Sequence, residues 1–161
     1  MNEKRRLLGM TLDELKGVAF EAGLPGYAAK QMADWLYKKK VTSIAAMTNI
    51  ASAKRALLEK NFEVGAVPPS DLMKSVDGTI KYLYPAGPGN FVESVYIPTE
   101  DRATLCVSSQ VGCKMNCLFC MTGKQGFTKN LSANEILNQI QSLPETEELT
   151  NIVFMGMGEP L

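Results

Sequence analysis

Apolar residues recur at helical spacing through the first 65 residues of the chain. Thr11 and Glu14 form a capping-box pattern, and apolar positions follow at the period of a helix, so a first helix is predicted from residue 12. The Gly-Leu-Pro-Gly sequence at 23–26 ends it. Similar patterns predict a second helix over 27–39 and a third over 52–62. The front of the chain is therefore expected to be a small helical domain, residues 1–66.

The pattern changes from helical to alternating after the Val-Pro-Pro-Ser sequence at 67–70. Apolar runs at 72–76 and 79–84 flank an Asp-Gly pair, which is a strong signal for a β-hairpin. A second turn precedes another predicted strand at 91–97. Residues 67–100 are therefore expected to form an antiparallel β extension.

One acidic residue stands out on the last of these strands. The two-residue period of a strand places Glu93 on the same face as Phe91, Val95 and Ile97. A carboxylate among apolar neighbours lies either at the rim of a sheet or in a cavity, where it needs a partner or a raised pKa. Considered alone, Glu93 is more simply explained as a surface carboxylate.

The final segment, residues 101–161, has the pattern of a β/α unit. A strand is predicted at 104–107, a long loop at 108–127, a helix from a capping box at Ser132 to about residue 143, and a buried strand at 150–155. This order is typical of a parallel sheet or barrel. Because one crossover cannot cover both faces of a parallel sheet, we expect the chain to be the front portion of a larger protein.

The composition is that of a water-soluble domain or pair of domains. The chain has 161 residues, of which 45% are hydrophobic, and no apolar run approaches the roughly 18 residues needed to span a bilayer. The N-terminus lacks the apolar region of a secretory signal, so we expect a cytoplasmic protein. The chain contains no histidine, which excludes histidine general-base catalysis and histidine-ligated zinc within it.

The zero net charge hides an uneven distribution. Residues 1–70 carry eleven basic and seven acidic side chains, whereas residues 71–161 carry six and ten. A basic front end could attract a polyanion such as RNA, but a solvated helical surface explains it equally well. The Lys38–Lys40 run ends a predicted helix, where cations favour the helix dipole. Trp35 and Tyr37 could stack on bases, but core packing is their commoner use.

All four cysteines lie within fifteen residues, at Cys106, Cys113, Cys117 and Cys120. The last three have gaps of three and then two residues, which differ from the paired spacing of a zinc ribbon. Three thiolates can hold a 4Fe–4S cluster and leave one iron open to a small molecule. Cys106 precedes them on a predicted strand, where a buried inert thiol is the simpler explanation.

The cysteine triplet, with Phe119 before its third member, resembles the signature of radical S-adenosylmethionine (SAM) enzymes. Three surrounding runs resemble the RlmN family of RNA methyltransferases more narrowly: 105–113 (LCVSSQVGC), 121–127 (MTGKQGF) and 155–161 (MGMGEPL). The resemblance covers nearly the whole chain and is most specific from residue 93 onwards. It implies that the β/α unit begins a partial radical SAM (βα)6 barrel, within an α/β fold.

The resemblance also implies roles for individual residues. Cys113, Cys117 and Cys120 would bind three irons of a 4Fe–4S cluster, and SAM would bind the fourth. Gly158 and Glu159 match an element that contacts SAM, although a tight turn with a solvent-facing acid is an alternative for them. Glu93 falls at the position of a proton acceptor. Cys106 falls at that of a cysteine that resolves the covalent RNA–enzyme intermediate by forming a disulfide.

The family's reaction methylates C2 of an adenosine in 23S rRNA and in some tRNAs through a methylated cysteine, with an electron donor such as flavodoxin. The methyl-carrying cysteine lies near the C-terminus of the full enzyme, and the four cysteines here leave none for that role. We therefore expect the 161-residue chain alone to be inactive. The alternatives are a Cfr-like methyltransferase acting at C8, a structural four-cysteine zinc protein, and an RNA-binding fragment without activity.

Overall fold

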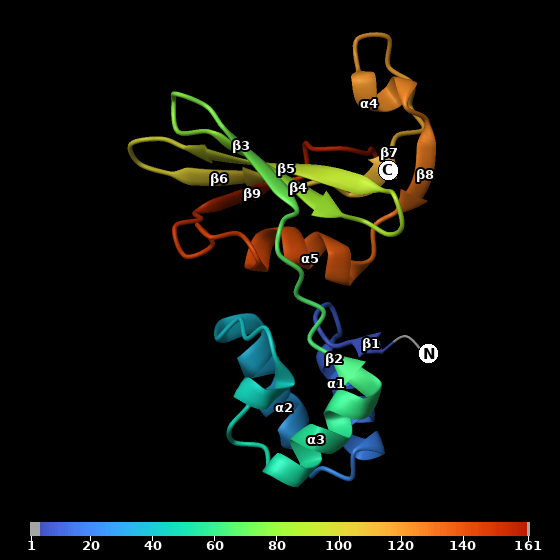
Figure 1. The fold of residues 1–161 in the computed structure, drawn as a ribbon, viewed down its shortest axis with the longest axis vertical. Helices are drawn as coiled ribbons and strands as arrows, with labels where there is room; N and C mark the ends of the chain where they lie inside the picture. The colour runs from blue at the N-terminus through green and yellow to red at the C-terminus, as the bar shows by residue number, and fades with distance from the viewer. Residues whose placement is uncertain (1–3, 161) are drawn as a thin grey trace. The chain divides into compact units, whose positions relative to one another are not determined.

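The structure, a computed structural model, describes residues 4–160. The chain divides into two compact units, one ending at Ala66 and the other beginning at Val67 (Figure 1). Within the described residues, no helix combines the length and apolar character required to cross a membrane.

The first unit consists of short helices closed by a small parallel ribbon. The three predicted helices are confirmed, and the second continues as a π-helix. The ribbon was not predicted, because each of its strands has only two residues. The elements are β1 (Arg5–Arg6), α1 (Leu12–Glu21), α2 (Ala28–Ala33), the π-helix η1 (Asp34–Lys38), the 3-10 helix η2 (Ile44–Ala46), α3 (Ser52–Asn61) and β2 (Phe62–Glu63).

The predicted capping box at the start of α1 is present in both directions. The Thr11 hydroxyl accepts a hydrogen bond from the Glu14 amide, and the Glu14 carboxylate accepts one from the Thr11 amide. This satisfies backbone donors that a helix start leaves unpaired. The apolar side of α1, including Leu15 and Val18, is then fully buried in the core of this unit.

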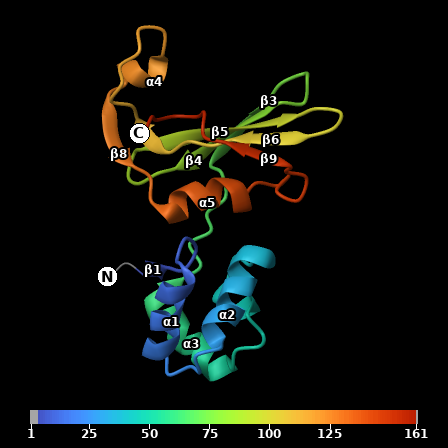
Figure 2. The ribbon, with the colours of Figure 1, turned by 180° about the vertical axis from the view of Figure 1, so that it is seen from behind.

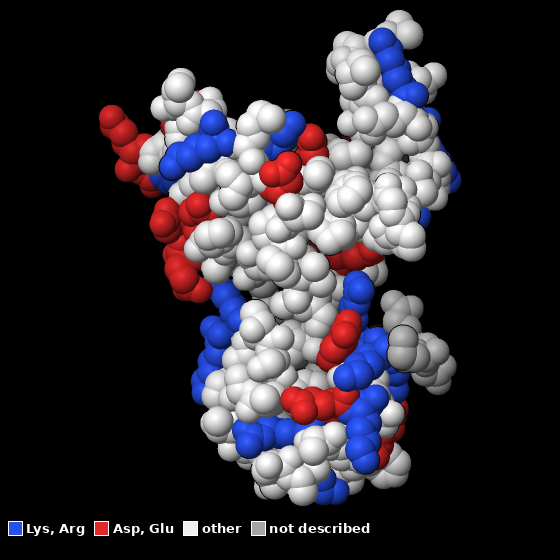
Figure 3. Space-filling view, in the orientation of Figure 1, with Lys and Arg blue, Asp and Glu red and all other residues white. Residues whose placement is uncertain are grey.

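The basic and aromatic residues of the second helix are engaged within the first unit. Lys38 pairs with Asp34 at 2.8 Å, and the Lys39 ammonium lies 3.5 Å from the ring centroid of Trp35. The Tyr37 hydroxyl donates to the Met10 carbonyl at 2.6 Å. On the face of this unit seen in Figure 3, acidic side chains are interspersed with basic ones. These contacts explain the residues without a nucleic acid.

The second unit is built on a five-stranded sheet in the order β3-β4-β5-β6-β9, with a separate β7-β8 ribbon. The predicted hairpin and third strand are present as antiparallel β3, β4 and β5, and β9 pairs parallel with β6. The elements are β3 (Asp71–Lys74), β4 (Ile80–Pro85), β5 (Phe91–Pro98), β6 (Ala103–Cys106), β7 (Gln110–Gly112), α4 (Met121–Lys124), β8 (Phe127–Asn130), α5 (Ala133–Gln141) and β9 (Asn151–Val153). Thus the predicted extension and the predicted β/α unit share one sheet.

Helix α5 lies along one face of this sheet, as the two opposite views in Figures 1 and 2 show. The side chains that face it from the strands form the core, among them Tyr82, Val92 and Leu105 at 0–1% exposure. Alternate residues point to the other face, where Phe91 and Ile97 remain exposed. Among the described residues of the second unit, no helix covers that second face, as expected from a single crossover.

Two predicted elements differ in the structure. The predicted loop at 108–127 contains β7 and α4, and β7, just before the three cysteines, pairs with β8, which follows α4. The predicted buried strand at 150–155 is only three residues long, and its Ile152 and the following Phe154 are 44% and 62% exposed. Its apolar run indicated burial on both faces, but β9 is an edge strand here and pairs only with β6.

Candidate active site

The segment that leads to the cysteines and the segment 155–159 both begin at the carboxyl ends of strands in the sheet, the first after β6 and the second after β9. Strands β6 and β9 run parallel, so their carboxyl ends lie together. Backbone pairing continues past both strands, because the Val107 amide donates to the Val153 carbonyl at 2.9 Å and the Gly156 amide donates to the Val107 carbonyl at 3.1 Å. Two segments far apart in sequence are thereby held side by side where α/β proteins commonly bind ligands.

Glu93 and Cys106 share the sheet face that α5 does not cover. Cys106 lies directly opposite Val95 in the β5-β6 register, and Glu93 is two residues from Val95 on the same strand. Residues opposite each other in a ladder, and alternate residues on a strand, point to the same side. The two residues predicted to be catalytic therefore project from one surface.

Glu93 has a basic partner on this surface. Its carboxylate lies 3.0 Å from the Lys81 ammonium, and both side chains are a little under half exposed. The pair borders a hollow of about 150 Å³ that is also lined by Leu72, Met73 and Leu83. The sequence suggested that Glu93 lies either at the rim of the sheet or in a cavity with a partner. The structure shows a partly exposed Glu93 carboxylate that borders a hollow and has a basic partner there.

Cys106 is a free, half-buried thiol at the end of β6. Burial raises the pKa of this thiol, and a hydrogen bond from the Met155 amide opposes that effect. Met155 belongs to the segment that follows β9, so Cys106 lies next to the segment containing Gly158 and Glu159. The four-cysteine zinc site requires Cys106 to join the cysteine loop, whereas its side chain here belongs to the sheet.

The other three cysteines lie on a protruding loop between β7 and α4 (Figure 1). All three thiols are free; Cys117 is exposed and the other two are half-buried. A hydrogen bond from the Gly123 amide, helped by Thr122, lowers the pKa of the Cys120 thiol. Gly123 also lets α4 pack against this loop, since a Cβ atom there would lie 3.1 Å from the Cys117 amide nitrogen.

The segment after β9 is held by the residues that follow β6. The Met157 amide donates to the Ser108 hydroxyl at 2.8 Å, and the Glu159 amide donates to the Gln110 side-chain oxygen at 3.0 Å. Gly158 has φ +103°, and a Cβ atom there would lie 2.6 Å from Cβ of Gln110, so only glycine fits. The Glu159 side chain is exposed, and Leu161 lies outside the described residues.

Two family models match different parts of the chain, one in the first unit and one in the second. Residues 5–64 match the family model for the ribosomal RNA large subunit methyltransferase N-terminal domain, and residues 107–161 match that of the radical SAM superfamily. The chain is 81% identical over its whole length to the probable dual-specificity RNA methyltransferase RlmN of Parabacteroides distasonis. The chain is similar to the N-terminal portion of RlmN proteins.

Two further RlmN proteins and a solved structure show the same similarity. The chain is 65% identical to the probable RlmN of Bacteroides thetaiotaomicron over all of its residues, and 46% identical to RlmN of Geotalea uraniireducens over 99% of them. A crystal structure of a radical SAM methyltransferase from Sphaerobacter thermophilus matches 97% of the chain and 48% of that protein, with a TM-score of 0.87 and 38% identity. The predicted α/β class and partial radical SAM fold are thus confirmed.

The chain spans about half the length of these relatives, 47% in the case of the Parabacteroides protein. The match lies in the N-terminal portion of that relative.

The RlmN family uses a 4Fe–4S cluster and SAM, and the donor set of this chain fits the cluster. Its loop offers three free thiols and no histidine, which matches a cluster with one open iron. Among the described residues, however, no group of three or more cysteine or acidic side chains is close enough together to hold a metal ion. Cluster binding would therefore have to draw the three thiols of the loop together.

Sequence reasoning missed a group of buried polar residues that supports the candidate site. Gln139 of α5 is completely buried, and its side-chain oxygen accepts hydrogen bonds from the Ser108 amide at 2.9 Å and the Ser94 hydroxyl at 2.6 Å. Its side-chain nitrogen donates to the carbonyls of Ser108 and Glu135. One signal was available, because Gln139 lies between Ile136 and Ile140 on the apolar side of the helix.

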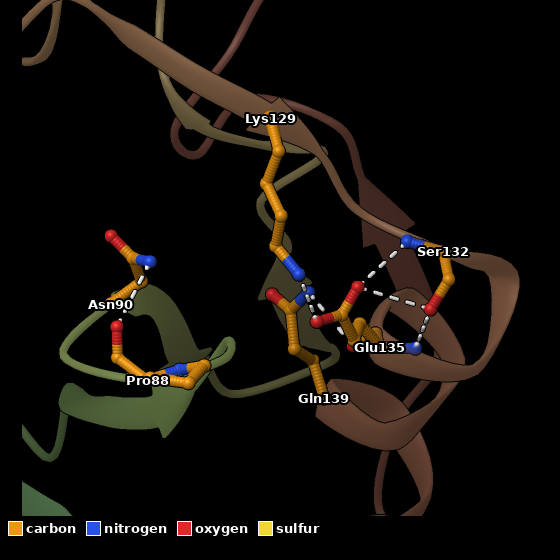
Figure 4. A network of polar contacts seen from close by, with 6 residues as sticks. All are labelled: Pro88, Asn90, Lys129, Ser132, Glu135 and Gln139. Atoms are coloured by element: carbon orange, nitrogen blue, oxygen red, sulfur yellow. Dashed lines mark hydrogen bonds and ion pairs between the residues drawn. The ribbon is translucent and has the colours of Figure 1, made fainter.

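A second polar cluster joins β8 to the start of α5 (Figure 4). The Glu135 carboxylate accepts hydrogen bonds from the Lys129 ammonium at 2.6 Å and from the Ser132 amide at 2.8 Å, which completes the predicted capping box. Burial opposes ionisation of this carboxyl, but these partners outweigh it and lower its pKa. The strand that leaves the cysteine loop is thereby tied to the helix that carries Gln139.

Cys106 and Cys120 have thiol pKa values shifted in opposite directions, so in the chain without a cluster they should react with an alkylating agent at different rates. We expect iodoacetamide to modify Cys120 several times faster than Cys106 near pH 8, because the thiolate is the nucleophile and only Cys120 has a lowered pKa. The Cys120 rate should level off at a lower pH than the Cys106 rate. Tandem mass spectrometry of timed samples measures both rates. The difference should disappear in urea, and equal rates in the folded chain would contradict the assignment.

Proposed function

We propose that this chain is the N-terminal part of a radical SAM methyltransferase that methylates C2 of an adenosine in 23S rRNA and in some tRNAs. The observation that carries the proposal is the joint position of two segments, since the cysteine loop and the 155–159 segment both follow the carboxyl ends of paired parallel strands. Both segments lie in a chain that is 81% identical to a protein named as an RlmN RNA methyltransferase.

Two groups of residues would bind the cofactors. Cys113, Cys117 and Cys120 would hold the 4Fe–4S cluster, which together with SAM supplies radical chemistry when bound. Gly158 and Glu159 would contact SAM, where a carboxylate can accept hydrogen bonds from the ligand's ammonium group.

Glu93 and Cys106 would act on the substrate from the uncovered sheet face. Glu93 would accept a proton; its carboxylate lies on this face, 3.0 Å from the Lys81 ammonium. Cys106 would resolve the covalent RNA–enzyme intermediate by forming a disulfide with the methyl-carrying cysteine of the full enzyme, as that cysteine's sulfur–carbon bond to the RNA breaks and the electron pair stays with the RNA carbon.

The partners are proposed on the same basis. The first unit, which matches the N-terminal domain of ribosomal RNA methyltransferases, would dock on the RNA substrate. An electron donor such as flavodoxin would reduce the cluster, and the protein would act in the cytoplasm. C8 methylation of the Cfr type remains the alternative reaction, and product analysis on a full-length relative carrying these residues separates the two.

Anaerobic reconstitution of the chain with iron and sulfide tests the proposal. We expect a brown protein whose low-temperature electron spin resonance signal, after reduction, changes when SAM is added, because the ligand binds the open iron. A colourless, zinc-containing protein would contradict the proposal. The same preparation with reductant, SAM and ribosomal RNA is expected to form no methyladenosine, since none of its four cysteines is left to carry the methyl group.

A further inference from the structure

The hydroxyl of Ser108 connects two parts of the candidate site that are far apart in sequence. Ser108 is completely buried. Its hydroxyl donates to the backbone carbonyl of Glu93 at 2.6 Å and accepts from the backbone amide of Met157 at 2.8 Å. One side chain therefore joins the strand that carries Glu93 to the segment that carries Gly158 and Glu159.

Ser108 is itself held in place from the other side of the sheet. The side chain of Gln139 binds both the amide and the carbonyl of Ser108, at 2.9 and 3.0 Å. Every donor and acceptor of this amide is used, since it also binds Ser94 and the Glu135 carbonyl. A buried amide with all its hydrogen bonds made has one favourable orientation, so Ser108 is fixed relative to α5.

The segment after β9 has close contact with Ser108 and little freedom beside it. A Cβ atom on Gly156 would lie 2.7 Å from both the Ser108 hydroxyl oxygen and the Val107 carbonyl oxygen. The Met157 carbonyl accepts from the amides of Ser109 and Gln110 at 2.9 and 3.2 Å. The Met157 backbone is therefore bound on both its amide and its carbonyl side by residues 108–110.

We propose that Ser108 is a positioning residue that sets the SAM-contacting segment at a fixed distance from the Glu93 strand. This inference rests on the proposed function, because it assumes that Gly158 and Glu159 contact SAM. Ser108 contacts no reacting atom itself. Its role is to orient the backbone at Met157. Gly158 and Glu159 then already have the conformation that contacts SAM, so less conformational entropy is lost on binding.

The test compares Ser108→Ala with Ser94→Ala in the 161-residue chain. Both variants remove a buried hydroxyl, but the Ser94 hydroxyl donates to Gln139, whereas the Ser108 hydroxyl binds the Glu93 carbonyl and the Met157 amide. Amide hydrogen exchange measured by NMR should be roughly tenfold faster at Met157 in Ser108→Ala and unchanged there in Ser94→Ala. In the reconstituted chain, the SAM dissociation constant should rise roughly fivefold in Ser108→Ala only.

A second variant keeps the test decisive if Ser108→Ala fails to fold. Gly156→Ala would push the segment away from Ser108 while the Ser108 hydroxyl keeps its bond to Glu93, and it should accelerate exchange at Met157 in the same way. Equal Met157 exchange in Ser108→Ala and Ser94→Ala, or unchanged SAM affinity in Ser108→Ala, would overturn the positioning role. Failure of the unaltered reconstituted chain to bind SAM would instead contradict the proposed function.

Discussion

Replacing any one of Cys113, Cys117 or Cys120 with alanine is expected to abolish the 4Fe–4S cluster, reducing iron from about four atoms per reconstituted chain to a trace. The three thiols are the entire cysteine content of the protruding loop, and no histidine exists to replace a lost ligand. Iron and sulfide analysis, together with the visible absorption of the brown protein, measures the loss.

The matched control for this experiment is Cys106→Ala. Cys106 lies on the sheet, opposite Val95, and we expect its removal to leave the iron content unchanged. Loss of iron in Cys106→Ala to the same extent as in the other three variants would show that four cysteines act together, and would favour the structural metal site over the radical SAM cluster.

The second large effect is expected at Gln139. Replacing it with leucine should lower the free energy of unfolding by about 3 kcal/mol, because the buried amide and carbonyl of Ser108 and the hydroxyl of Ser94 would all lose their partner. Urea denaturation followed by circular dichroism measures this change. The variant should also disturb the site, since Ser108 joins the Glu93 strand to the segment after β9.

Gln141→Leu provides the control for that measurement. Gln141 lies on the same helix but is only half-buried, so the same substitution there should change the free energy of unfolding by less than about 1 kcal/mol. A similar cost in both variants would mean that helix propensity or added apolar surface, and not the buried hydrogen bonds, explains the effect at Gln139.

The two faces of the sheet contribute differently to the candidate site. One face packs against α5 and contains the buried network around Gln139, which sets the positions of the strand ends. The other face carries Glu93 and Cys106 among apolar side chains that remain exposed, such as Phe91 and Ile97. A face of this kind is suited to receiving further barrel strands or a substrate, because its apolar surface gains stability when it is covered.

The sequence alone determined the features that depend on neighbouring residues. The capping boxes at Thr11 and Ser132 predicted where two helices begin, because the paired residues are only three positions apart. The spacing of Cys113, Cys117 and Cys120 predicted the chemistry of the loop for the same reason. The short β1-β2 ribbon and the edge position of β9 escaped prediction, since each depends on a partner far away in the sequence.

Only the tertiary structure decided which distant residues meet. That Glu93 and Cys106 share a face follows from the β5-β6 register, and a shift of one residue would place them on opposite faces. That Ser108 joins the Glu93 strand to Met157 follows from the crossover through α5, which brings β9 beside β6. Register and crossover are settled by burial of the core as a whole, and no local pattern of residues encodes them.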